Sequence, residues 1–154
     1  MIELNIKFHE KYKRLDALCK DIFSSKDGVT QYIYEMECTE PKYIRQIYNW
    51  EDIYYKLKHL RWVRNQLAHE VGAFESKLCA EDDVEWLDNF YNAVLHYSDP
   101  LAKVGKMKQQ ETQKYHTVNK DTFNARQTSN SSISNNTKPS LWSKIKAKIK
   151  KWFS

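Results

Sequence analysis

Apolar side chains recur at spacings of three and four residues in several segments of the first 104 residues, and this spacing restricts the fold most. Such spacing places apolar side chains on one face of an α-helix. Glycine and proline, which interrupt helices, number only three each in 154 residues. The pattern therefore predicts an all-α domain over residues 1–104, folded as a four- to five-helix up-and-down bundle.

Two long helices have the clearest boundaries. The first is expected from about residue 3 to residue 24. The central helix is expected to begin after Asn49, a favourable N-cap residue, and to end near Glu70, where Gly72 can adopt the left-handed conformation. The apolar residues expected to face inward are Leu4, Phe8, Tyr12, Leu15, Leu18, Ile22, Ile53, Leu57, Leu60 and Leu67.

Further helices complete the expected bundle. Two short ones are expected at 30–37 and at 41–48, where Pro41 suits a first turn. Asp82 or Asp83 is expected to cap a longer helix, which breaks or restarts at Ser98-Asp99-Pro100. The residues expected to face inward here are Tyr32, Ile33, Met36, Ile44, Ile47, Val84, Leu87, Tyr91, Val94 and Leu95.

The net charge of +5 is distributed unevenly along the chain. Residues 1–102 carry 13 Lys and Arg against 18 Asp and Glu, whereas residues 103–154 carry 12 against 2. The body is therefore acidic, and the basic part indicates a polyanionic partner, either a membrane or a nucleic acid. Residues 105–139, which are rich in Lys, Gln, Asn, Ser and Thr, are expected to form a disordered polar linker.

Residues 140–154 have the pattern of a basic amphipathic helix. With about 100° per residue, the large apolar side chains fall within roughly 120° and lysines occupy the remainder. About 13 helical residues are too few to span a bilayer, so we expect a helix lying on an anionic membrane surface. RNA binding by base stacking and docking onto protein are the alternatives. The residues expected to make the contact are Leu141, Trp142, Lys144, Ile145, Lys148, Ile149, Trp152 and Phe153.

The sequence offers no motif for a metal or a cofactor, and we expect neither. Cys19, Cys38 and Cys79 form no CxxC pair, and the five histidines show no zinc-type spacing with them. An odd number of cysteines suits a reducing compartment, and we expect no signal peptide because the first residues hold no sufficiently long apolar run. We therefore expect a cytoplasmic protein that the basic helix holds at the inner face of the cell membrane.

The segment Arg64-Asn65-Gln66-Leu67-Ala68-His69 is the strongest candidate for a functional site. Arg64 stands where the spacing of the central helix requires an apolar residue, and such inconsistencies concentrate at functional sites. RNA cleavage at the 2′-hydroxyl requires a base, an acid and positive charge near the developing phosphorane. His69 can supply the acid or base, Arg64 can hold the phosphate, and Asn65 can orient either group.

Arg64 and His69 lie five residues apart, which separates them by roughly 140° around an ideal helix. One chain alone therefore does not bring both side chains onto one phosphate, whereas a twofold dimer with two such helix ends side by side does. The alternative is structural. In that case Arg64 pairs with a carboxylate at the edge of the core, and His69 binds the last carbonyl groups of its helix.

The stretch from Leu60 to Glu70 resembles the signature motif of the HEPN superfamily, in which an arginine, usually followed by a polar residue, is separated from a histidine by four to six residues. The resemblance implies a small helical bundle that is generally dimeric. It implies either a metal-independent endoribonuclease of toxin, defence or RNA-processing systems, or a non-catalytic RNA-binding module. The resemblance assigns Arg64, Asn65 and His69 to the active site.

One position departs from part of this superfamily. HEPN toxins that pair with a nucleotidyltransferase antitoxin have a tyrosine two residues after the histidine, where this chain has Val71. We therefore expect a HEPN-like homodimer outside that subgroup. It is expected to bind or cleave RNA and to be tethered to a membrane surface, and the alternative is a non-catalytic dimeric interaction or scaffold module.

Overall fold

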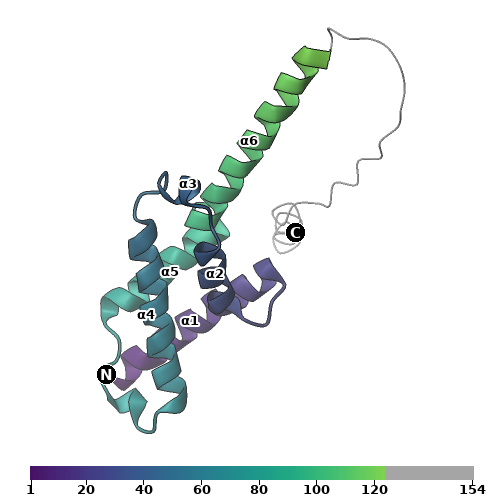
Figure 1. The fold of residues 1–154 in the computed structure, drawn as a ribbon. Helices are drawn as coiled ribbons and strands as arrows, with labels where there is room; N and C mark the ends of the chain where they lie inside the picture. The colour runs from purple at the N-terminus through teal and green to yellow at the C-terminus, as the bar shows by residue number, and fades with distance from the viewer. Residues whose placement is uncertain (124–154) are drawn as a thin grey trace. The chain divides into compact units, whose positions relative to one another are not determined.

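A computed structural model describes residues 1–123 of the chain, with side chains up to residue 114. Every regular element in that range is helical, so the predicted all-α bundle is confirmed (Figure 1). Residues Met1–Lys103 form one compact unit, and the described residues from Val104 onward belong to another. The amphipathic helix predicted at 140–154, and the predicted linker from residue 124 onward, lie outside the described residues.

Helix α1 (Ile2–Phe23) is the central element of the first unit. Three helices pack against it, namely α2 (Gly28–Glu37), α4 (Trp50–His69) and α5 (Glu81–Leu95) (Figure 1). The short helix α3 (Pro41–Ile44) and the 3-10 helix η1 (Ala73–Glu75) lie in the connections, and α6 begins at Pro100. The sequence predicted α1 to within about one residue at each end, because apolar spacing and the left-handed Ser24 bound it.

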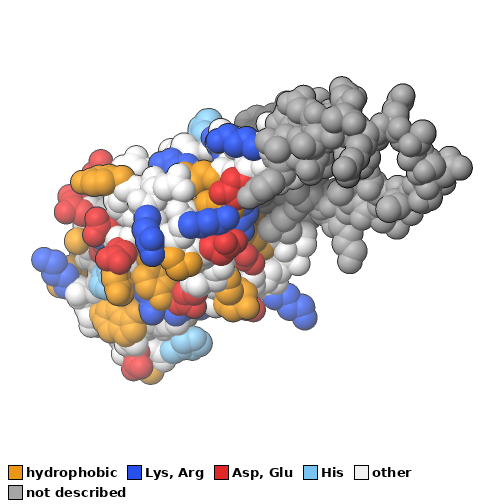
Figure 2. Space-filling model, turned by 45° about the horizontal axis from the view of Figure 1, so that its top comes forward, with side chains coloured by type: hydrophobic (Ala, Val, Ile, Leu, Met, Phe, Trp, Pro, Cys, Tyr) orange, Lys and Arg blue, Asp and Glu red, His pale blue; other side chains and the backbone are white. Residues whose placement is uncertain are grey.

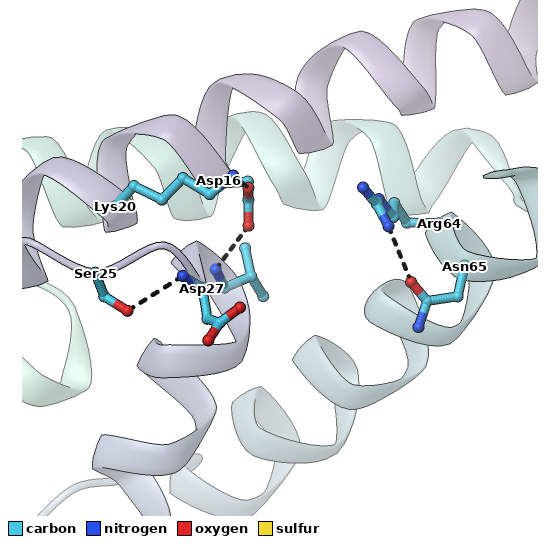
Figure 3. A network of polar contacts seen from close by, with 7 residues as sticks. Asp16, Lys20, Ser25, Asp27, Arg64 and Asn65 are labelled. Carbon is cyan, nitrogen blue, oxygen red and sulfur yellow. Dashed lines mark hydrogen bonds and ion pairs between the residues drawn. The ribbon is translucent and has the colours of Figure 1, made fainter.

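Close packing of α2 against α1 requires a glycine. A Cβ atom at Gly28 would lie 2.1 Å from the carbonyl oxygen of Asp16 in α1. Beside it, the Asp16 carboxylate accepts a hydrogen bond of 2.9 Å from the backbone N–H of Val29 (Figure 3). Helix α2 therefore begins two residues earlier than predicted, because Gly28 is a contact residue and not a turn residue.

The sequence predicted the positions of the helices more accurately than it predicted their buried residues. In four helices, a residue that was not predicted to be buried lies in the core. It is either adjacent to a residue predicted to be buried or lies between two such residues. One residue turns a helix by about 100°, and the buried stripe is about as wide, so spacing does not fix the stripe's centre. The residues found buried without having been predicted include Asn5, Cys19, Tyr43, Val63 and Phe90, whereas Leu4, Leu18, Ile44, Ile53 and Tyr91 are only half-buried.

Two predicted boundaries are wrong. Helix α3 ends at Ile44 and does not continue to residue 48. Helix α6 runs from Pro100 to Phe123, so residues 105–123 are helical where a disordered linker was predicted. The apolar spacing fades there, but Lys, Gln and Glu favour helices without any apolar stripe. Fading amphipathicity therefore did not mark the end of the helix.

The start of α5 also differs from the prediction, because Asp83 lies in its first turn and is not its N-cap. Its carboxylate accepts a hydrogen bond of 2.8 Å from the backbone N–H of Ala80, and Lys56 of α4 donates to its other oxygen at 2.5 Å. Burial alone would raise the pKa of Asp83, but these two donors outweigh burial and lower it. Asp83 therefore binds the backbone of the N-cap residue Ala80 and also ties α5 to α4.

Candidate functional site

Arg64 lies beside the buried stripe of α4 and not within it. Val63 fills the core position between Leu60 and Leu67, and Arg64 is half-buried next to it. The apparent break in the apolar pattern was therefore a one-residue misplacement of the stripe. The surroundings of Arg64, and not its place in the apolar pattern, therefore decide whether it is a candidate functional residue.

The guanidinium of Arg64 is oriented by its neighbour in sequence. Its Nη1 donates a hydrogen bond of 3.2 Å to the side-chain oxygen of Asn65 (Figure 3). Within the described part of the chain, Arg64 forms no ion pair with a carboxylate. The structural alternative, in which a carboxylate at the edge of the core neutralises Arg64, is therefore not found among those residues.

His69 is the last residue of α4 and is exposed. The helix end is closed by the backbone N–H of Glu70, which donates to the carbonyl of Gln66 at 2.9 Å. The His69 imidazole makes no hydrogen bond within the described residues, so the carbonyl-binding role suggested by the alternative is not observed there. The single chain thus brings Arg64 and Asn65 together, and it leaves His69 on another side of the helix.

The connection that follows His69 is anchored to α1 by Asn5, which is 1% exposed. The Asn5 amide donates to the carbonyl oxygens of Phe74 at 2.9 Å and Ser76 at 2.8 Å, and it accepts from the thiol of Cys79. Figure 1 shows the N-terminal end of α1 beside this connection. The end of α4 is therefore held in place against α1, although nothing in the sequence pattern singled out Asn5.

A histidine that sequence reasoning missed lies close to Arg64. His9 of α1 is half-buried, and burial lowers its pKa, with Arg64 and then Lys13 lowering it further and Glu10 opposing them. Burial, followed by Asp16, raises the pKa of Tyr12, and Arg64 and Arg61 oppose that change. The spacing of four residues between His9 and Lys13 was visible in the sequence, but the approach of α4 to α1 was not.

The outward face of α4 carries exposed aromatic rings. Tyr55 is 64% exposed and Trp62 is 49% exposed, and they lie seven residues apart on one helix face. The ring of His59 stacks on Trp62 with centroids 6.0 Å apart and an interplanar angle of 25°. Rings arranged in this way offer a stacking surface for nucleic-acid bases or a contact surface for protein.

Other kinds of site gain no support within the described residues. No helix there is long and apolar enough to cross a bilayer, and no three His, Cys, Asp or Glu side chains are grouped to hold a metal ion. On the face drawn in Figure 2, hydrophobic, basic and acidic side chains are interspersed. The predicted membrane-contacting residues, from Leu141 to Phe153, lie outside the described part of the chain.

One protein-family model matches nearly the whole chain. It covers residues 6–152, a span that includes the helical bundle, α6 and most of the basic C-terminal segment. No curated protein and no solved structure gives a significant match. The chain belongs to DUF6548, a protein family of unknown function.

Proposed function

We propose that this chain is a HEPN-like protein that acts as a dimer to bind RNA and cleave it without a metal ion. The observation that carries the proposal concerns the partners of the Arg64 side chain. Arg64 is a half-buried residue whose guanidinium donates an exposed hydrogen bond to Asn65 and forms no ion pair among the described residues. A cation without a carboxylate partner and with a planar fork of donors is well suited to a phosphate.

The reaction assigned to the site is attack of the 2′-hydroxyl on the adjacent phosphorus. Arg64 holds the phosphate and stabilises the charge that develops on its oxygens. The partner protomer's single His69 accepts the proton of the attacking hydroxyl and, as the imidazolium, donates a proton to the departing 5′-oxygen. The products are a 2′,3′-cyclic phosphate and a 5′-hydroxyl, so neither water nor metal enters this step.

Dimerisation follows from the position of the side chains along α4. Arg64 and His69 are roughly 140° apart around the helix, so one chain does not aim both at one phosphate. A twofold axis near the end of α4 would set the Arg64 of one protomer against the His69 of its partner. The exposed Tyr55 and Trp62 supply apolar area on the same helix for base stacking or for the dimer contact.

Cleavage of a fluorescent single-stranded oligoribonucleotide in excess EDTA tests the proposal. We expect Arg64→Ala and His69→Ala each to slow cleavage about 100-fold or more. Arg45→Ala and His96→Ala, matched changes at an exposed arginine and an exposed histidine outside the site, should cleave at the wild-type rate. Equal rates in all five proteins, or no cleavage by the wild type, would overturn the nuclease assignment.

Mixed dimers test whether the site is shared between protomers. Arg64→Ala and His69→Ala proteins are mixed in equal amounts and allowed to exchange subunits. If each site takes Arg64 from one chain and His69 from the other, random pairing restores about one quarter of the wild-type activity. Absence of any restoration, with exchange shown by fluorescence energy transfer, would place both residues of a site in one chain.

A non-catalytic dimeric interaction module is the second candidate, and the exposed aromatic face of α4 favours it. In that case Trp62→Ala dissociates the dimer in analytical ultracentrifugation. Arg64→Ala and His69→Ala then leave any effect on RNA unchanged. Under the nuclease proposal, those two variants lose cleavage while they sediment as dimers.

The basic C-terminal segment is proposed to bring the protein to an anionic membrane surface. Its support is compositional, since residues 103–154 carry 12 basic against 2 acidic side chains and the large apolar residues of 140–154 share one helical face. We expect the full chain to sediment with vesicles containing phosphatidylserine, and deletion of residues 140–154 to abolish this. Sedimentation of the truncated protein with the same vesicles would refute the membrane assignment.

A further inference from the structure

His9 is an incompletely satisfied polar side chain in a well-anchored place. Its Nδ1 atom is buried and has no hydrogen-bond partner among the described residues. One side of the ring meets the edge of Phe74, with centroids 6.1 Å apart and an interplanar angle of 65°. Because Asn5 holds the backbone of Phe74 at 2.9 Å, the aromatic neighbour of the imidazole is fixed in place. Its other nitrogen, Nε2, is the atom left to contact a ligand.

Cations gather around this imidazole from two helices. Lys13 of α1 and Arg64 of α4 both act on His9, and Arg61 acts with Arg64 on the adjacent Tyr12. None of the three forms an ion pair within the described residues. The cluster therefore holds three cations without acidic partners, although residues 1–102 carry more acidic than basic side chains.

Two acidic groups lie near the cluster, and one of them is engaged with other groups. Glu10 acts on His9 from its own helix, and Asp16 acts on Tyr12. Asp16, however, is committed to Lys20, at 2.7 Å, and to the backbone N–H of Val29 (Figure 3). Lys13, Arg61 and Arg64 are therefore available to an anion, with Glu10 as the acidic group beside His9.

We propose that His9, Lys13 and Arg64 of one chain form a binding site for the phosphate group of a phosphodiester, with Arg61 at its edge. In this site the guanidinium of Arg64 binds two phosphate oxygens, Lys13 supplies a point charge, and Nε2 of His9 donates a hydrogen bond. His9 is thus the imidazole that shares a phosphate with Arg64 of its own chain, and His69 is left to act across the dimer.

This inference rests on the proposed function for the identity of the ligand as RNA. The phosphate site itself does not require cleavage, since every contact in it is a binding contact. A ligand phosphate has two sources, a nucleic-acid backbone and free inorganic phosphate, and the same three side chains would bind either. His9 acts as a binding and positioning residue, because its enclosed Nδ1 has no acceptor for the second proton of a cationic ring.

The experiment follows the His9 ring in the full-length wild-type protein by NMR. It is titrated with pH alone, with inorganic phosphate, and with a single-stranded oligodeoxyribonucleotide, which lacks the 2′-hydroxyl and cannot be cleaved. A bound phosphate should raise the pKa of His9, because the anion favours the cationic ring. A shift with both ligands identifies a general phosphate site, and a shift with the oligonucleotide alone identifies a backbone site. No shift with either ligand overturns the proposal.

Variants supply a second, independent measurement. We expect His9→Gln to weaken oligonucleotide binding about tenfold, as measured by fluorescence anisotropy, because a hydrogen bond to a charged group is lost. Lys13→Ala, at an exposed position that should not perturb folding, should lower the slope of log affinity against log salt by about 1. His96→Gln is the matched control and should bind as the wild type does.

The outcomes separate this inference from the nuclease assignment. If His69→Ala abolishes cleavage while His9→Gln and Lys13→Ala bind the oligonucleotide normally, the nuclease stands and the His9 phosphate site is refuted. If no protein cleaves RNA but His9→Gln and Lys13→Ala bind weakly, the phosphate site stands and the nuclease is refuted. Circular dichroism of each variant confirms that it is folded.

Discussion

Two polar clusters within residues 1–103 differ in how completely their groups are paired. In the first, the hydroxyl of Tyr32 donates to the Asp99 carboxylate at 2.6 Å, and the backbone N–H of Ala102 donates to the same oxygen at 3.2 Å. Tyr32 is 2% exposed and Asp99 is 3% exposed. In the second, around His9 and Arg64, a buried ring nitrogen has no partner and the cations have no carboxylate among the described residues.

The difference indicates two roles for polar side chains in one small bundle. Paired buried groups contribute to stability because each donor has an acceptor, and here they join α2 to the start of α6. Incompletely paired groups at the surface cost stability, and proteins tolerate that cost chiefly at functional sites. The pairing of polar atoms, more than residue type, therefore separates the structural cluster from the candidate site.

The largest expected effect is on the paired cluster. Asp99→Ala leaves the Tyr32 hydroxyl and a backbone N–H without an acceptor, and we expect it to lower the free energy of unfolding by about 3 kcal/mol. Asp99→Asn keeps a side-chain oxygen and removes the buried charge, so it should change stability by less than about 1 kcal/mol. Urea denaturation followed by circular dichroism measures both, and equal losses would contradict a role for the accepted hydrogen bonds.

A smaller effect of opposite sign is expected at His9. His9→Leu removes the unpartnered buried nitrogen at similar side-chain volume, so we expect it to raise the free energy of unfolding by about 1 kcal/mol. The same variant should bind single-stranded RNA more weakly than the wild type. A loss of stability as large as that of Asp99→Ala would show that His9 belongs with the structural cluster and not with a ligand site.

The smallest effects are pH dependences, and the two clusters should differ in sign. Burial, Arg64 and Lys13 lower the pKa of His9 below its ordinary 6.5, so the unfolded chain binds the proton more tightly. The wild type should therefore lose stability relative to His9→Leu as pH falls through 6.5 toward the lowered pKa. Denaturation midpoints between pH 5 and pH 8 measure this difference, and a constant offset would contradict it.

Asp99 should show the reverse dependence. Burial raises the pKa of Asp99 above its ordinary 3.8, although the Tyr32 hydroxyl and backbone donors oppose the change. The folded state then binds the proton more tightly, so the wild type should lose stability relative to Asp99→Asn as pH rises from 3.8 toward the raised pKa. If this relative stability instead improved with pH over that interval, Asp99 would be a favourably ionised group.

Much of the fold was predictable because it follows from local spacing. The apolar repeat and the scarcity of glycine and proline predicted the helical bundle, and Ser24 and Asn49 mark helix ends close to the expected positions. The errors share one cause. A helix places adjacent residues about 100° apart, so a stripe centred one residue away exchanges Val63 for Arg64 or Phe90 for Tyr91.

The candidate site divides in the same way. Arg64, Asn65 and His69 were identified from a local motif, because a motif needs only neighbouring residues. The electrostatic effect of Arg64 on His9 depends on the packing of α4 against α1, and no spacing within either helix encodes that packing. Asn5 was missed for the same reason, since its partners, Phe74 and Ser76, are distant in sequence.

The sequence by itself determined that this chain is helical and that its excess of basic over acidic residues lies in residues 103–154. It also determined that an arginine–histidine motif lies at the end of a long helix. Those properties depend on composition and local spacing. Only the tertiary structure decided which of two adjacent residues is buried, which polar groups find partners, and which histidine approaches Arg64. These properties depend on contacts between α1, α2, α4 and α5, and contacts between distant segments are set by packing of the whole bundle.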